Sequence, residues 1–416
     1  MKLNFLKWFY PGMGIKRWIG LAILGIIMVS FGSANLLAEV FFFGKIVDTI
    51  TIFLGIILIV ISGYKILVSF ISVFLPKNRS DLATIFFARR QLERGPKIVA
   101  VGGGHGLSML LHGIKEYTNN ITAIVTVADS GGSSGRLREQ FDVLPPGDIR
   151  NCLVALADSE PLMQKLFQFR FEEGGDLKGH NFGNLFITAL TKVTGDFEAA
   201  IKASSKVLAI RGEVIPSTLQ NVSLVAEYKD GSIIQGEHRI PEKNLPIRRV
   251  SLVPGDSPAT EEAVKAIKEA EVILLGPGSL YTSIIPNLLT KGITDAISDS
   301  KVLKIYVCNV MTQPGETDGY KASDHVEALV HHSSKDIINH CIVNINTEAP
   351  KELLERYKRE QSFPVIADSH RIKEMGYSVV EEELISASDF LRHDSAKLSK
   401  LIINLILGKR PRKTAS

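Results

Sequence analysis

The sequence predicts an α/β domain with a mostly parallel sheet, helices on both faces of that sheet and a small antiparallel insertion, preceded by a two-helix transmembrane hairpin. Two long apolar runs, at about 18–37 and 52–75, open the 416-residue chain. From residue 97 onward, short β-branched runs without alternation take turns with helical patterns, as in sheets that are buried on both faces. Within 215–250 the hydrophobic pattern alternates instead, and Asp230-Gly231 marks an antiparallel hairpin.

Residues 1–76 are expected to form the transmembrane hairpin. Each apolar run offers the roughly 20 residues of helix that cross a bilayer, and neither shows the polar face expected if it were instead a helix of a soluble core. Lys and Arg residues gather before the first run and after the second. The positive-inside rule therefore predicts a multi-pass cell-membrane protein with both termini and the soluble domain in the cytoplasm.

Two short basic segments flank the predicted domain at 97–408. Residues 77–96 form a linker that is either an amphipathic helix on anionic headgroups or a solvated segment, and 409–416 form a disordered tail. The formal net charge of +4 is too small to predict nucleic-acid binding. The three cysteines form no C-x-x-C pair, which is typical of buried thiols in a reducing compartment and gives no sign of a metal site.

A strand at 97–101 leads straight into a glycine loop and then a helical pattern at 107–117. This arrangement brings free backbone N–H groups and the positive end of a helix dipole to a phosphate. The spacing matches neither the dinucleotide fingerprint G-x-G-x-x-G nor a Walker A loop, so it predicts a phosphate without selecting a cofactor. A tight turn without a ligand is the alternative. The loop residues expected at the ligand are Gly103, Gly104, His105 and Gly106.

The second loop follows a strand at 121–128 and is rich in glycine and serine. Small residues let several N–H groups turn toward one anion, while serine hydroxyls and an arginine add donors. Asp129 could accept sugar hydroxyls or hold a metal through water, and it is the one candidate for a catalytic group. The ligand-binding residues predicted in this loop are Asp129, Ser130, Gly132, Ser133, Ser134, Gly135 and Arg136.

Further polar clusters stand at strand or helix ends, where ligands bind in open parallel sheets. Asp148 is either part of the site or only the N-cap of the helix that follows it. The segment 279–282 is either a phosphate or sugar site or a helix cap. The residues predicted to bind ligand in these clusters are Asp148, Arg150, Asn151, Asn181, Asn184, Gly276, Gly278, Ser279, Tyr281, Thr282, Asn309, Thr312, Gln313 and Thr317.

The chain carries six motifs in one order: G-G-G-H-G from Gly102, V-T-V-A-D-S-G-G-S-S-G-R-L-R from Val125, P-P-G-D-I-R-N from Pro145, G-H-N-F-G-N from Gly179, L-G-P-G-S-L-Y-T-S from Leu275 and C-N-V-M-T-Q-P-G-E-T-D-G-Y from Cys308. From about Pro96 to its end it resembles the gluconeogenesis factor family, which is similar in fold to the 2-phospho-L-lactate transferases of deazaflavin coenzyme synthesis. The resemblance implies a Rossmann-like domain whose ligand is a nucleotide sugar, UDP-N-acetylglucosamine or UDP-glucose. It also implies links to carbon-source use, cell shape and peptidoglycan precursor supply.

The favoured function is that of a nucleotide-sugar-binding regulatory protein held at the membrane, without an assigned reaction. The alternative is a phosphotransfer enzyme of the 2-phospho-L-lactate transferase type. Ser130 stands where many family members carry a second acidic residue, which counts against magnesium and against that reaction. A nicotinamide-dependent oxidoreductase is a third hypothesis, although the broken fingerprint disfavours NAD. A homodimer and an envelope-synthesis protein stay open as partners.

Overall fold

The computed structural model of the chain describes residues 16–37, 44–74, 90–159, 161–346, 350–387 and 391–409. The chain divides into two compact units, Met1–Phe87 and Ala88–Ser416. Lys2 and Lys7, most of the predicted 77–96 linker and all but the first residue of the predicted tail lie outside the described residues, whereas Lys16 and Arg17, the other basic residues before the predicted first span, are described.

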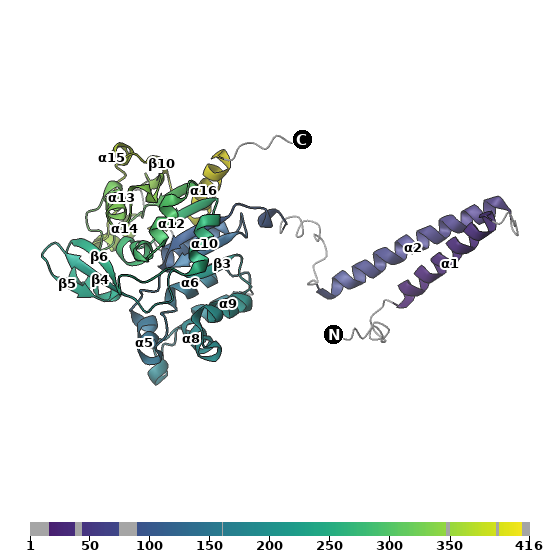
Figure 1. Ribbon diagram of the computed structural model, residues 1–416, viewed down its shortest axis with the longest axis horizontal. Coiled ribbons are helices and arrows are strands. Elements are labelled where there is room, and N and C mark those ends of the chain that lie inside the picture. Colours follow the sequence, from purple (N-terminus) through teal and green to yellow (C-terminus); the bar gives the residue numbers. More distant parts are fainter. Residues whose placement is uncertain are drawn as a thin grey trace. The chain divides into compact units, whose positions relative to one another are not determined.

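The first unit is a pair of long helices, α1 (Lys16–Leu37) and α2 (Lys45–Phe74). The segments Arg17–Leu37 and Lys45–Ser69 have mean hydropathies of 2.0 and 2.4, so both are long and apolar enough to cross a membrane. Figure 1 shows the two helices side by side. They approach closely where glycines meet, because a Cβ added to Gly25 would lie 2.7 Å from the carbonyl oxygen of Gly55.

The second helix begins seven residues earlier than the predicted span at 52–75, because polar residues before the apolar run are also helical. The hydroxyls of Thr49 and Thr51 donate to the carbonyls of Lys45 and Val47, each at 2.8 Å, and so satisfy their own hydrogen bonds inside the helix. Asp48 in the same turns is 2% exposed and accepts a hydrogen bond from Asn35 Nδ2 at 3.2 Å. This polar pair therefore joins the end of α1 to the start of α2.

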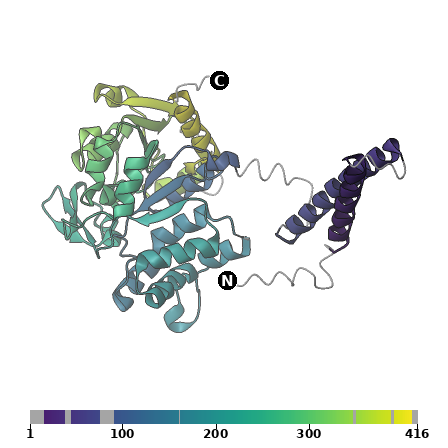
Figure 2. The same cartoon turned by 45° about the vertical axis from the view of Figure 1, so that its right-hand side comes forward.

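The second unit is built on a seven-stranded sheet whose pairs are all parallel, in agreement with the predicted fold class. Every residue of the central strands is buried, so layers cover both faces of the sheet. Figures 1 and 2 show the strands inside the unit and the helices outside. The strand order is β10 (Ser378–Glu382), β9 (His340–Asn344), β8 (Leu303–Val307), β7 (Val272–Leu275), β1 (Ile98–Gly102), β2 (Ile121–Val125) and β3 (Glu213–Pro216).

Helices connect the strands, as expected for parallel crossovers. Of these, α4 packs against α6 and α16 and also contacts β1. The helices of this unit are α4 (Gly104–Ile114), α5 (Gly132–Phe141), α6 (Gly147–Leu156), α7 (Pro161–Gln168), α8 (Phe182–Thr194), α9 (Phe197–Leu208), α10 (Glu261–Glu269), α11 (Ile285–Leu289), α12 (Ile293–Asp299), α13 (Ala322–His331), α14 (Lys351–Arg359), α15 (Ser369–Glu374) and α16 (Ser395–Lys409). Single turns are η2 (Gly175–Leu177), η3 (Glu237–Arg239), η4 (Pro241–Lys243), the π turn η5 (Leu280–Ile284) and η6 (Lys335–Ile337).

The predicted antiparallel insertion is a three-stranded sheet of order β5-β4-β6, made of β4 (Ser223–Tyr228), β5 (Ile233–Gln235) and β6 (Ile247–Val253). Its limits differ from the predicted 215–250. Pro216 still pairs with Val125 in the main sheet, and β6 continues to Val253. A short hairpin of β11 (Ile385–Ala387) and β12 (Leu391–His393) was not expected, and α16 runs one residue into the predicted tail.

Candidate functional site

The main pocket is a cavity of about 540 Å³ at the carboxyl ends of β1, β7 and β8. From β1 the chain runs outward through β2 and β3, then returns to β7 on the other side of β1. Such a switch point is where open α/β sheets bind ligands. The predicted residues that line this cavity are Gly103, Gly104, His105, Gly106, Asp129, Asp148, Gly278, Ser279, Thr282, Asn309, Thr312 and Gln313.

The glycine loop after β1 presents the open end of α4 to this cavity. Gly103 is the N-cap of α4 and has no side chain to occupy the first N–H groups of the helix. Gly104 has a φ of +62°, a conformation that favours glycine. A Cβ added to Gly106 would lie 2.5 Å from the carbonyl oxygen of Pro277. The loops after β1 and β7 therefore pack backbone against backbone.

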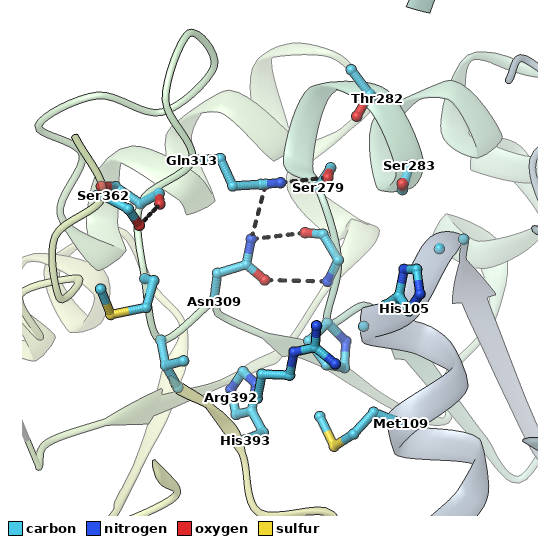
Figure 3. A pocket seen from close by; sticks show the side chains of 18 of the residues that line it. His105, Met109, Ser279, Thr282, Ser283, Asn309, Gln313, Ser362, Arg392 and His393 are labelled. Atoms are coloured by element: carbon cyan, nitrogen blue, oxygen red, sulfur yellow. Dashed lines mark hydrogen bonds between the residues drawn. The ribbon is translucent and has the colours of Figure 1, made fainter. Parts of the chain in front are cut away.

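Asn309, just after β8, holds the β7 loop in place. Its Nδ2 donates to the carbonyl of Gly278 at 2.8 Å, and its Oδ1 accepts from the N–H of Gly278 at 3.2 Å. Gln313 continues the wall, because its Nε2 donates to Ser279 Oγ at 2.6 Å. Figure 3 shows this chain of amides along one side of the cavity. Ser279 is the N-cap residue of the following turn, as the helix-cap alternative expects, but its side chain makes no cap hydrogen bond and accepts from Gln313 instead.

Four carboxyl groups reach the main pocket, from Asp129, Asp148, Glu237 and Glu360. Burial, with repulsion from Asp129, raises the pKa of Asp148 to about 7. Burial, with repulsion from Asp129 and Asp148, raises the pKa of Glu237 to about 8. Near neutral pH Glu237 is therefore mostly protonated and can donate a hydrogen bond, so the pocket is less negative than its carboxyl count suggests.

Asp148 lines the pocket and is not the N-cap of α6, so that structural alternative is wrong. The N-cap is Pro146, and Asp148 lies in the first turn. A Cβ added to Gly103 would lie 2.4 Å from Asp148 Oδ2, and the backbone N–H of Gly104 bonds to this carboxyl. The Asp148 carboxyl therefore occupies space that any side chain at position 103 would fill.

Arg392 brings a positive charge to the pocket from the β11–β12 hairpin. Figure 3 shows it among the side chains of the cavity wall, with His105 and His393. The pKa of His105 is lowered by burial and then by Arg392 and Arg150, so its ring is neutral at pH 7. Burial lowers the pKa of His393 to about 4, and its Nε2 lies 3.0 Å from the carbonyl oxygen of Cys308. His393 thus joins the hairpin to the end of β8.

The second loop is mostly used to join neighbouring elements. Ser130 Oγ lies 2.9 Å from His238 Nδ1, and Ser133 Oγ accepts from the N–H of Asn181 at 3.2 Å. Arg136 Nη2 donates to the carbonyl of Lys178 at 2.9 Å. Of the loop's predicted ligand-binding residues, the main pocket receives Asp129 but not Ser130, Gly132, Ser133, Ser134, Gly135 or Arg136.

Other predicted residues support the site or lie in an adjoining cavity. Tyr281 is 2% exposed and its hydroxyl lies 2.8 Å from that of Tyr320. Thr317 Oγ1 accepts from the N–H of Gln313 at 2.9 Å, and the N–H of Gly276 donates to the carbonyl of Val101 at 2.9 Å. Arg150, Asn151 and Asn181 line the adjoining cavity, and Asn184 bonds to Arg150 beside it.

Sequence reasoning missed several residues of the main pocket. Glu237 comes from the antiparallel insertion and Arg392 from the unexpected hairpin. The others are Met109, Pro277, Ser283, Val310, Met311, Pro314, Tyr357, Glu360, Ser362, Leu391 and His393. A charged Arg392-His393-Asp394 segment just before a helix was the one available signal for the hairpin. Among the described residues, no group of three or more His, Cys, Asp or Glu side chains is arranged to hold a metal ion.

Comparison with known proteins agrees with this architecture. The model of the family "2-phospho-L-lactate transferase CofD" matches residues 98–385. The "Gluconeogenesis factor" of Bacillus subtilis is 47% identical over 75% of this chain and 98% of its own length. A "Putative gluconeogenesis factor" of Nostoc sp. is 44% identical over 96% of this chain and 92% of its own length. The crystal structure of a UPF0052 family member from Bacillus halodurans superposes with a TM-score of 0.72 at 47% identity, covering 74% of this chain and 99% of that one. The chain therefore belongs to the gluconeogenesis factor family, with the fold of the CofD proteins.

Proposed function

We propose that this chain is a membrane-anchored, cytoplasmic UDP-sugar-binding regulatory protein that links carbon metabolism to cell shape and peptidoglycan precursor supply. The observation that carries the proposal is that the start of α4, where the N–H of Gly104 bonds to Asp148, and the guanidinium of Arg392 line the same main pocket. Free N–H groups, a positive helix end and a guanidinium together suit a diphosphate. A volume of about 540 Å³ lies within the range of small-molecule sites.

The uncharged wall of the pocket suits the rest of such a ligand. The amides of Asn309 and Gln313 and the hydroxyls of Ser279 and Thr282 offer donors and acceptors at fixed positions. The protonated carboxyl of Glu237 adds a donor. Sugars and nucleobases are recognised by such groups, and none of these residues forms a nucleophile–base pair that would assign a reaction.

The transferase remains the second candidate, favoured by one observation. Asp129 and Asp148 are close enough to raise the pKa of Asp148, and both line the main pocket. A divalent cation would relieve this repulsion and could be carried in by a nucleotide diphosphate. The transferase function therefore requires that ligand binding depend on magnesium.

Calorimetric titration of the full chain in detergent separates these functions. The ligands are UDP-N-acetylglucosamine, UDP-glucose, NAD and GDP, each with and without magnesium. We expect micromolar, magnesium-independent binding of a UDP-sugar, weakened about 10- to 100-fold by Arg392→Ala, because a charged hydrogen bond contributes roughly 1.5–3 kcal/mol. Lys358→Ala, on the exposed surface of α14, is the control and should bind as the parent does. Binding of GDP alone, or an absolute need for magnesium, would favour the transferase instead.

A further inference from the structure

A second cavity of about 550 Å³ adjoins the main pocket and shares His105 and Met109 with it. It lies among α4, α6, α7 and the start of α8, so all its lining residues come from the segment between His105 and Asn181. The residues that line it are His105, Ser108, Met109, His112, Arg150, Asn151, Val154, Ala155, Gln164, Gln168, Arg170 and Asn181. We call it the arginine cavity.

Arg150 is the fixed cation of the arginine cavity. It is 8% exposed, and its stem packs so tightly that a Cβ on Gly183 would lie 2.8 Å from its Cδ. Its Nη1 donates to Asn184 Oδ1 at 3.1 Å and its Nη2 to Asn151 Oδ1 at 2.6 Å, so both partners are neutral amides. Its Nε is buried and has no hydrogen-bond partner within the described part of the chain. A buried N–H without an acceptor is destabilising, so the guanidinium of Arg150 keeps one donor that no acceptor in the described part of the chain satisfies.

A second guanidinium adds to the positive charge beside Arg150, which Asp148 and Asp129 offset only in part. Arg170 lines the same cavity and is held by a 2.7 Å hydrogen bond from its Nη1 to the carbonyl of Gly179. Burial, then repulsion from Arg170, lowers the pKa of Arg150 to about 10. Over the residues that the structure describes, neither arginine forms an ion pair. Two like charges held close together are stabilised when an anion binds between them.

We infer that the arginine cavity binds the phosphate group of a small phosphorylated molecule, as a site separate from the main pocket. Two arginines, with Asn151 and Asn181, supply directed donors for several oxygen atoms of a phosphate. Gln164, Gln168 and His112 extend the polar lining. A phosphate alone would leave most of the volume empty, so the cavity has room for the rest of a phosphorylated metabolite.

His105 connects the two sites. It lines both cavities, and its pKa is lowered by Arg392 from one side and by Arg150 from the other. Occupancy of the arginine cavity by an anion would offset the effect of Arg150 and change the hydrogen bonds that His105 can make in the main pocket. The chain would then respond to two ligands, one through each cavity.

Equilibrium dialysis of the full chain in detergent against radiolabelled inorganic phosphate tests this inference. We expect millimolar or tighter binding that Arg170→Gln weakens about tenfold or more, the effect of losing roughly 1.5 kcal/mol. Lys165→Gln, on α7 outside both cavities, is the matched control. Because Arg170 is exposed, its replacement leaves the fold intact; Arg150→Lys, which keeps the charge but loses the Nε donor, should weaken phosphate in the same direction.

Four results would overturn the inference. The first two are the absence of phosphate binding at millimolar concentration and equal phosphate binding by Arg170→Gln and the parent. The third is displacement of phosphate by citrate with equal affinity, which would assign the site to a carboxylate. The fourth is displacement of phosphate by UDP-N-acetylglucosamine, which would make the two cavities one extended site. The dialysis needs no nucleotide sugar. A chain that binds phosphate in this way but no UDP-sugar would therefore support the arginine cavity and contradict the proposed function.

Discussion

Replacing Gly106 by alanine tests the contact between the two glycine loops. Helix propensity alone predicts a gain of about 1 kcal/mol, because Gly106 lies inside α4. The structure predicts the opposite sign. The new Cβ would lie 2.5 Å from the carbonyl oxygen of Pro277 and 2.8 Å from Gly278 Cα, and backbone atoms cannot rotate away. Overpacking of this kind costs about 1–3 kcal/mol.

We expect Gly106→Ala to lower the Tm by roughly 2 °C for each kcal/mol lost, the low end for a domain of this size. UDP-sugar affinity should fall as well, because the loop after β7 must move. Gly102→Ala is the matched control: its Cβ would meet Leu107 at an ordinary 3.6 Å. Differential scanning fluorimetry and calorimetric titration measure both quantities. If Gly106→Ala were as stable and bound as tightly as Gly102→Ala, the packing argument would be refuted.

Three further predictions follow from the same contacts. UDP-sugar affinity should fall about tenfold between pH 7 and pH 9 as Glu237 loses its proton above its pKa of about 8, and Glu237→Gln should flatten this titration. Asn309→Ala leaves the N–H and carbonyl of Gly278 without their partners and should weaken UDP-sugar affinity about tenfold in calorimetry. An unchanged Kd would show that the hydrogen bonds of Asn309 do not position the loop after β7. In the hairpin, Gly55→Leu should separate α1 from α2, because a Cβ there would lie 2.7 Å from the carbonyl oxygen of Gly25; persistence of a cross-link between cysteines placed in facing turns would contradict it.

Much of the fold could be predicted because local patterns carry it. A β-branched run followed by glycine and a helical pattern identified β1 and its loop, and the run at 121–128 located β2. In a parallel sheet the carboxyl ends share one edge, so predicting the strands also predicted which loops would meet. This is why Gly103, Ser279 and Asn309 were expected at one site before any contact was known, and the structure brings them together.

The rest of the candidate site depends on contacts between segments far apart in the sequence, which the spacing of residue types along the chain does not reveal. The serines of the second loop were expected to face an anion, but Ser133 is 4% exposed and bonds to the start of α8. Their small size serves close packing, since a Cβ on Gly147 would lie 2.4 Å from Ser134 Oγ. The strands β11 and β12 have three residues each, too few for a periodic pattern, so Arg392 could not be placed at the pocket.

The position of β1 between β2 and β7 has a consequence for the order of synthesis. Part of the main pocket is encoded by the first half of the second unit, part by its second half, and Arg392 by the last pair of strands before α16. A nascent chain therefore contains its two apolar N-terminal helices long before it has a complete pocket. Ligand cannot assist folding during translation; it can only select chains that have already been finished and released.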